Sequence, residues 1–322
     1  MPTLKVLITT DVEIWPDGWD RMGPEDFKAS YRKYILGDTP RGQYGLPFQL
    51  RLLDEHGLHG VFMVETLFTH GYGIEPLRDI VGLIQERGQE VQLHLHPEWI
   101  DKFDTPILPR LRGYYMHQYT DEEQRTLLRM GLNSLREAGV DNVSAFRAGS
   151  YGAGHSTLEA LAAVGLRYDT SHNQVYQGDA CLIDNPPHLS QPAKIGGVWE
   201  LPITCFREPS GRIRPLQIHA CSLAEIQRTL IHAREQGWHN VVIVLHGSEL
   251  LGESKRRVDP IAVRRYEGMC RFLADHAEDF ETCGFDHPEL LPGTPAHPPY
   301  ATLPLHLGIA RRAEQTIRRI WA

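Results

Sequence analysis

Two histidines stand two residues apart at the end of an apolar run, in the stretch Gln92-Leu93-His94-Leu95-His96-Pro97-Glu98-Trp99. Side chains alternate across a β-strand, so His94 and His96 are predicted to point to the same face. Near the N-terminus, Thr10-Asp11-Val12-Glu13 places two carboxylates after another apolar run. Two imidazoles and a carboxylate from a second strand are a common zinc ligand set in catalytic sites, where one position stays open for water. The pattern indicates hydrolysis at a metal ion.

The apolar runs that precede these residues are predicted to be strands that alternate with helices. Short runs rich in Val, Ile and Leu predict strands, and amphipathic stretches that end at glycine predict helices. Strands are expected at 4–9, 60–65, 90–96, 143–146, 166–168, 198–203, 240–246 and 280–285, and helices at 46–56, 74–87, from 120, and at 157–164, 223–236 and 262–276. This alternation favours an α/β fold with a parallel sheet or barrel.

Polar residues follow directly after five of these predicted strands. They are Asp11, His94, Arg147, Asp169 and His246. The active site of a (β/α) barrel lies at the C-terminal ends of its strands. We therefore expect these five side chains to meet at one end of the sheet.

The domain boundary is predicted near residue 286. Residues 1–286 form the barrel domain, and residues 287–322 form a proline-rich linker and a C-terminal helix that begins at Leu305. Docking on the barrel is the favoured role of this helix. A homo-oligomer contact, another partner or a membrane surface are the alternatives. Two irregular insertions, 16–45 and 97–119, interrupt the barrel pattern, and the first is interpreted as a loop with short helices that covers the substrate.

Composition narrows the classes of function. The 322 residues carry a formal net charge of −8, which argues against a general nucleic-acid-binding protein. The five cysteines are scattered and lack Cys-x-x-Cys spacing, so a disulfide framework and a cysteine-rich zinc site are not expected. The N-terminus lacks the features of a signal peptide, and no segment is long and apolar enough for a transmembrane helix. The expected compartment is the cytoplasm.

The chain resembles the polysaccharide deacetylase superfamily (NodB-homology, carbohydrate esterase) in five motifs within residues 4–250. In the family's order they are Thr10-Asp11-Val12-Glu13, Gly88-Gln89-Glu90-Val91-Gln92-Leu93-His94, Phe146-Arg147-Ala148-Gly149-Ser150-Tyr151-Gly152, Tyr168-Asp169-Thr170-Ser171 and Val244-Leu245-His246. The resemblance implies a distorted (β/α) barrel with seven strands. It also implies metal-dependent removal of acetyl groups from N-acetylated sugars.

The resemblance assigns one divalent metal ion, with zinc favoured, to Glu13, His94 and a third ligand. The family has two adjacent Asp in its first motif, whereas a branch with a spaced acidic pair resembles this chain more closely. In the second motif the family's two His are four residues apart. Here Glu98 occupies that position and His96 is the additional imidazole. The third ligand is therefore either His96 or Glu98, and His96 is favoured.

The resemblance also assigns the catalytic groups. Asp11 would be the general base that acts on metal-bound water, held by a charge-assisted hydrogen bond from Arg147. His246 would be the general acid that protonates the leaving amine, with Asp169 at its other ring nitrogen. The backbone N–H of Tyr151 is a candidate oxyanion donor. Ser150 is the alternative, because this chain has one extra residue between the Arg and the Tyr of the motif.

Three aromatic residues and one carboxylate are further candidates for substrate contact. Trp15, Trp99 and Tyr151 could offer faces to sugar rings, although loop packing would explain each one alone. Glu200 could contact the substrate, and a structural role is favoured for it.

Three functions compete. The leading one is a metal-dependent carbohydrate N-deacetylase that acts on a polysaccharide, an oligosaccharide or its precursor. A soluble, lipid-linked or nucleotide-linked precursor is favoured over finished polymer because no export signal is recognised. The second is a cyclic amide or ureide hydrolase on the same scaffold. The third is a non-catalytic sugar-binding barrel, against which the retained Asp11, Arg147 and His246 argue.

Overall fold

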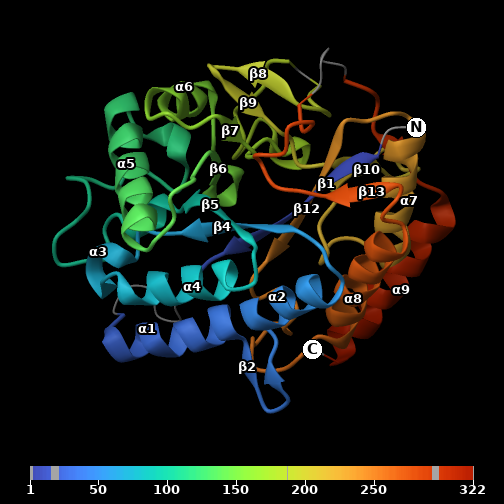
Figure 1. Cartoon of the computed structure of the whole chain (residues 1–322), viewed down its shortest axis with the longest axis horizontal. Helices are drawn as coiled ribbons and strands as arrows, with labels where there is room; N and C mark the ends of the chain where they lie inside the picture. Colours follow the sequence, from blue (N-terminus) through green and yellow to red (C-terminus); the bar gives the residue numbers. More distant parts are fainter. Residues whose placement is uncertain (1–2, 16–21, 187, 292–296, 322) are drawn as a thin grey trace.

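The computed structural model describes residues 3–15, 22–186, 188–291 and 297–321. Its centre is a curled sheet with helices around the outside (Figure 1). Parallel strands follow one another in the order β12 (Asn240–His246), β1 (Leu4–Val12), β4 (Gly60–Glu65), β5 (Glu90–Leu95), β6 (Ala145–Ala148), β7 (Tyr168–Asp169) and β9 (Val198–Glu200). Antiparallel β8 (Ala193–Ile195) flanks β9, and β13 (Phe280–Thr282) lies parallel to the start of β1. The predicted α/β class and distorted (β/α) barrel are confirmed.

The barrel closes between β9 and β12 through an irregular segment. Beyond β9 the chain still bonds to the segment that follows β7, where Ile203 N–H donates to His172 O over 2.8 Å. The next residue, Thr204, turns to β12 and donates its N–H to Val242 O over 3.2 Å. The chain then forms a small sheet of β10 (Cys205–Arg207), β11 (Ile213–Pro215) and β14 (Ala301–Thr302). This irregular closure is what distorts the barrel.

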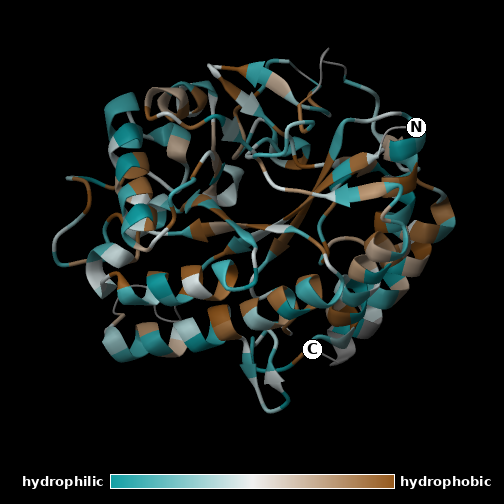
Figure 2. Cartoon of the chain, in the orientation of Figure 1, coloured by the Kyte–Doolittle hydropathy of each residue, from teal (hydrophilic) through white to brown (hydrophobic). Residues whose placement is uncertain are grey.

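Side chains of each strand alternate between two apolar layers. In β1, Leu7 packs inside the barrel with Val61 and Val242, whereas Val6 and Ile8 pack in the outer core beneath the helices. Because both faces are covered, all nine residues of β1 are buried, the polar Lys5, Thr9, Thr10 and Asp11 included. Figure 2 shows these central strands as largely hydrophobic and the surrounding helices as hydrophilic on their outer sides.

The helices that cover the sheet begin and end within two residues of the predicted positions. They are α2 (Leu46–Glu55), α4 (Glu75–Gln85), α5 (Asp121–Glu137), α6 (His155–Ala163), α7 (Leu223–Glu235) and α8 (Pro260–Asp275). The predicted capping box at the start of α5 is confirmed, since Thr120 Oγ1 accepts from Glu123 N–H. After α4 the chain turns at Gly88, whose φ of 65° is a left-handed conformation that glycine adopts without strain.

The two insertions contain short elements. The first holds α1 (Pro24–Tyr31), a π-helical turn (Arg32–Leu36) and the hairpin of β2 (Asp38–Thr39) and β3 (Gly42–Gln43). Its residues 16–21 lie outside the described part of the chain, so the interpretation as a cover over the substrate stays a prediction. After β4 comes α3 (Thr69–Tyr72), and the second insertion holds two single 3-10 turns, Pro97–Trp99 and Met116–Gln118.

The predicted C-terminal helix is α9 (Leu305–Trp321), and it docks on the barrel domain against α7. Its Arg311 side chain is fully buried and donates from Nε to Glu225 Oε1 over 3.1 Å. The same guanidinium forms an ion pair with Glu208, the residue after β10. The terminal segment is therefore packed on the barrel by buried ion pairs. Within the described ranges, no helix combines the length and the apolar character that crossing a membrane requires.

Candidate active site

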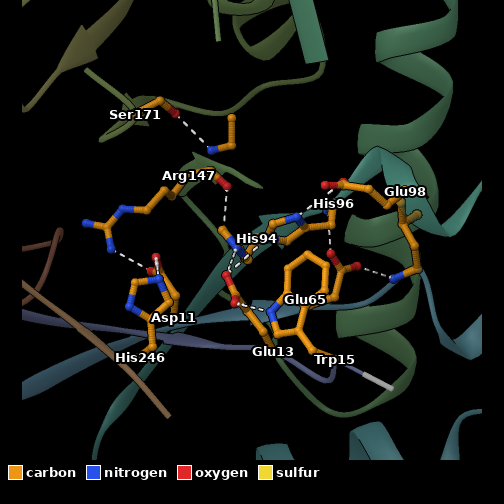
Figure 3. A network of polar contacts seen from close by, with 12 residues as sticks. Asp11, Glu13, Trp15, Glu65, His94, His96, Glu98, Arg147, Ser171 and His246 are labelled. Carbon is orange, nitrogen blue, oxygen red and sulfur yellow. Dashed lines mark hydrogen bonds and ion pairs between the residues drawn. The ribbon is translucent and has the colours of Figure 1, made fainter. Parts of the chain in front are cut away.

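The strand ends bring together six polar side chains from four strands or the residues directly after them (Figure 3). In the strand register His94 of β5 lies opposite Arg147 of β6, and Asp11 of β1 lies opposite His246 of β12. Glu13 and His96 each follow one residue after a strand end, on the same face as Asp11 and His94. Parallel pairing thus assembles residues that are far apart in sequence, as expected for the C-terminal edge of a barrel.

Glu13, His94 and His96 form a compact set of three ligand atoms, all within 4.8 Å of one another. Glu13 Oε1 lies 2.9 Å from His94 Nε2 and 3.0 Å from His96 Nε2. His94 Nδ1 lies 2.8 Å from Arg147 O, a group that can only accept, so Nδ1 carries a proton. His96 Nδ1 lies 3.2 Å from Glu98 Oε2 in the same way. When both rings are neutral, the Nε2 atoms of His94 and His96 direct their lone pairs toward the Glu13 carboxylate. A divalent cation bound by these three ligand atoms would complete the arrangement.

The two candidates for the third ligand therefore occupy different places. His96 directs Nε2 to the centre of the set. Glu98 lies on the opposite side of that ring, at Nδ1, where a carboxylate orients a ligating imidazole. This geometry fits a site of two histidines and one carboxylate, which suits zinc and several other divalent ions.

Buried groups hold these side chains in place. Glu65 accepts hydrogen bonds from the backbone N–H groups of Thr66, Leu67 and His96. Trp15 donates from Nε1 to Glu13 Oε2 over 2.6 Å, and its ring meets the His96 ring edge to face. A Cβ at Gly149 would lie 2.5 Å from His96 Nδ1, so a larger residue there would displace the imidazole. Sequence reasoning missed Glu65, and for Trp15 it considered sugar contact and loop packing but not a hydrogen bond to Glu13.

In the buried cluster of Glu13, His94 and His96, burial and the neighbouring charges shift the pKa values in opposite directions. Burial alone would raise the pKa of Glu13, but the two imidazoles overcome it and hold that pKa well below its usual range. Burial would lower the pKa of His96, but Glu13 and Glu98 raise it well above its usual value. Burial raises the pKa of Glu65 to about 7.

Asp11 and Arg147 form a buried ion pair beside the cluster of Glu13, His94 and His96. Arg147 is fully buried and donates from Nη1 to Asp11 Oδ1 over 2.5 Å. Its other donors are also used, Nη2 to Thr9 Oγ1 at 2.8 Å and Nε to Thr170 O at 3.0 Å. The guanidinium is thus fixed by two residues of β1 and by the residue that follows β7, and it fixes the Asp11 carboxylate in turn. The predicted pairing of Asp11 with Arg147 is confirmed.

His246 lies on the other side of Asp11, with its Nε2 3.8 Å from Asp11 Oδ2. Its Nδ1 lies 3.1 Å from Glu249 Oε1, and Gln217 contacts both groups. Burial lowers the pKa of His246, but Glu249, Glu13 and Asp11 together raise it to about 9. His246 is therefore protonated at neutral pH and presents Nε2 toward the site. Sequence reasoning missed Glu249, although a carboxylate three residues after the histidine was the available signal.

The predicted contact between Asp169 and His246 is wrong. In the register of β6 and β7, Asp169 lies opposite Phe146, whose side chain packs in the outer core. Asp169 therefore faces away from the barrel interior. Its carboxylate accepts from Ser171 Oγ over 2.8 Å, and Ser171 Oγ accepts from Ala148 N–H over 2.9 Å. Asp169 thus supports the loop after Arg147.

Glu200 lies beside Asp169, in register with it across β7 and β9, and its carboxylate accepts from the backbone N–H of His172. Burial, followed by the charge of Asp169, raises the pKa of Glu200 well above its usual value. Both side chains are fully buried. The favoured structural role of Glu200 agrees with this position.

The loop after β6 holds two residues in left-handed conformations, Ser150 with φ of 54° and Tyr151 with φ of 58°. Such strain is uncommon outside glycine and concentrates at functional sites. The Tyr151 hydroxyl is buried without a hydrogen-bond partner among the described residues, and its ring stacks on Tyr176 at 5.3 Å. Burial and the charge of Asp11 raise the pKa of Tyr151 well above its usual value. The oxyanion role of the Tyr151 or Ser150 N–H stays a prediction.

Trp99 does not face the site. It is 1% exposed and stacks on Phe103 at 5.8 Å. Its interpretation as loop packing is confirmed, and a role as a sugar face is wrong.

Among solved structures, the chain matches a protein from Mycobacterium smegmatis assigned as a polysaccharide deacetylase. The TM-score is 0.51 and the identity 20%, over 89% of this chain and 94% of that chain. The fold is that of the polysaccharide deacetylases. A family 4 carbohydrate esterase from Streptomyces lividans, solved with acetate, matches with a TM-score of 0.42 and 11% identity over 88% of this chain and 93% of that one.

A family 4 pseudoenzyme from Bacillus anthracis matches this deacetylase fold with a TM-score of 0.40 and 10% identity, over 87% of this chain and 63% of that chain. No protein-family profile matches the sequence. A search of curated proteins finds no relative.

Proposed function

We propose that this chain is a metal-dependent hydrolase that removes N-acetyl groups from a carbohydrate. The observation that carries the proposal is the convergence of three kinds of group at one edge of the barrel. Glu13, His94 and His96 form a metal-ligand set, and the Asp11–Arg147 pair and the protonated His246 lie beside it. A sugar-binding protein would not need a buried carboxylate and an acidic imidazole on either side of a metal site.

Glu13, His94 and His96 would hold the ion, with zinc favoured. When bound, the ion would polarise the acyl oxygen and make water a stronger acid. Glu98 and the carbonyl of Arg147 would keep the proton of each imidazole on Nδ1, so that Nε2 remains the ligand atom.

Asp11 would act as the base. Arg147 holds one carboxylate oxygen, which leaves the second oxygen available toward the His246 side of the site. Hydrolysis of the amide adds water to the carbonyl carbon, and Asp11 takes the proton that the water loses. The C–N bond then breaks to give acetate and the amine of the sugar.

His246 would act as the acid. An amine leaves poorly without a proton, and a protonated imidazole supplies it. Glu249 holds Nδ1, so the proton delivered to the leaving nitrogen is the one on Nε2. The pKa of about 9 keeps His246 in its acid form at neutral pH.

The test is acetate release from a panel of N-acetylated sugars by protein reconstituted with zinc, cobalt or manganese. His246→Ala should lower turnover by about 10²–10⁴-fold and leave metal content intact. Asp11→Asn should also lower turnover and leave metal content intact. Glu159→Gln, on the outer surface of α6, is the matched control and should change neither. Hydrolysis of cyclic amides without acetate release would replace this proposal with the ring-opening one. Turnover that persists in His246→Ala would contradict the role of His246.

A further inference from the structure

A cavity lies between β11, the loop that follows β12 and the C-terminal helix α9. Its volume is about 870 Å³, within the usual range for small-molecule sites. Its polar lining consists of Arg214, His219, Glu253, Lys255, Gln315 and Arg318. The docked C-terminal helix supplies the last two of these residues, so this wall of the cavity exists because α9 packs on the barrel.

The lining of the cavity carries three basic side chains against the single carboxylate of Glu253. Arg214 and Arg318 are held in position by ion pairs with Glu208 and Asp259. Lys255 is different. Its Nζ donates to Ser248 O over 3.2 Å, and no carboxylate of the described ranges lies within ion-pair distance of it.

Two features of Lys255, its backbone conformation and the burial of its charge, are energetically unfavourable. Its φ is 55°, a left-handed conformation that non-glycine residues seldom adopt outside functional sites. Burial lowers the pKa of its ammonium group; the negative charge of Glu249 opposes this shift, and the positive charges of Arg318 and Lys33 add to it. An anion in the cavity would place a further negative charge beside this buried ammonium group.

The cavity is coupled to the acid of the proposed reaction. Glu249 accepts at His246 Nδ1, and its charge also acts on His219 and Lys255 of the cavity lining. Gln217, two residues before His219, contacts the same imidazole at 3.4 Å. A ligand group in the cavity would therefore lie near the acid that serves the leaving nitrogen.

Phosphate is the anion that this lining fits. Two guanidinium groups and an ammonium group can supply several charge-assisted hydrogen bonds to one dianion, and both residue types are common phosphate ligands. The cavity is larger than a single phosphate, which leaves room for whatever the phosphate is attached to.

We propose that this cavity binds the phosphate or diphosphate of the substrate, so that the substrate class is an N-acetylated sugar that carries a phosphate. The inference rests on the proposed deacetylase function. Lys255, Arg214 and Arg318 are the phosphate-binding residues, and α9 contributes to substrate specificity through Arg318 and Gln315.

The first test measures binding of inorganic phosphate and of pyrophosphate to the full chain by calorimetry at constant ionic strength. Lys255→Asn removes the charge with a residue that tolerates the left-handed backbone. It should weaken binding about 10-fold or more, as expected for loss of a charged hydrogen bond. Arg318→Gln should also weaken binding, and Arg129→Gln on α5 is the control. Binding that is insensitive to Lys255 and Arg318, including binding at the metal-ligand set, would overturn the proposal.

The second test compares kcat/KM for an N-acetylated sugar phosphate with that for the same sugar without phosphate. The ratio should exceed one in the wild type and fall about 10-fold in Lys255→Asn. Deacetylation with an unchanged ratio would refute the phosphate site and leave the proposed function standing. Phosphate binding that depends on Lys255, in a protein that deacetylates neither sugar, would refute the function instead and support the phosphate site.

Discussion

Replacing Glu249 with Gln tests whether this carboxylate sets the protonation of His246. The side chain keeps its size and can still accept at His246 Nδ1, but the negative charge is lost. Glu249 gives the largest of the contributions that raise the pKa of His246, ahead of Glu13 and Asp11. A bound divalent cation would offset the charge of Glu13, so in the metal-loaded protein the contribution of Glu249 weighs even more.

The size of the effect follows from the hydrogen bond at His246 Nδ1. A hydrogen bond to a charged group contributes about 1.5–3 kcal/mol, against about 0.5–1.5 kcal/mol for a neutral one. One pH unit corresponds to about 1.36 kcal/mol, so exchanging the charged acceptor for a neutral one should lower the pKa of His246 by about one unit. The acid must be protonated to act, and activity is lost as pH rises through its pKa. Glu249→Gln should therefore move the basic limb of the pH–rate profile to lower pH.

The assay is kcat/KM for deacetylation from pH 5 to 10, together with an NMR titration of His246 in the same proteins. Glu159→Gln, which removes an exposed carboxylate on α6, should leave the basic limb where it is. If Glu249→Gln also left the basic limb and the titration of His246 unchanged, the argument that Glu249 keeps this imidazole protonated would be refuted.

Three further substitutions test other parts of the site. Arg147→Ala should destabilise the protein by about 3–5 kcal/mol in urea unfolding, since it leaves the buried Asp11 carboxylate unpaired. It should also shift the acidic limb of the pH–rate profile upward, and an unchanged limb would count against the Asp11–Arg147 pairing. Glu98→Gln should weaken metal binding about 10–100-fold in a chelator competition, because Glu98 orients His96; equal affinity would remove that role. Arg311→Met should cost about 3–5 kcal/mol of stability by leaving buried carboxylates without their cation, and a loss below about 1 kcal/mol would contradict its role in docking α9.

Most of the metal-ligand set could be predicted from the sequence because it depends on local periodicity. His94 and His96 share a face since two residues separate them on a strand, and Asp11 and Glu13 share a face for the same reason. The apolar runs before them identify the strands, and parallel pairing brings the strand ends together. To predict that these strand ends lie together, only the order of strands and helices along the chain was required.

The supporting groups could not be predicted, because their contacts are tertiary. Glu65 and Glu249 act through hydrogen bonds that only the folded chain defines. Asp169 was misassigned because β7 has only two residues and shows no alternation from which to read its face. Register with β6 places Asp169 on the outer side, whereas its neighbour Tyr168 packs inside the barrel.

Elemental analysis of protein purified without chelator or a metal-affinity tag tests most directly whether Glu13, His94 and His96 hold a catalytic ion. Wild type should contain about one equivalent of zinc or another divalent transition metal, as expected for a site with three protein ligands. His94→Ala should lose it, while His232→Ala, on the outer helix α7, should retain it. If neither wild type nor His94→Ala bound metal after reconstitution with zinc, the metal-dependent mechanism would be contradicted.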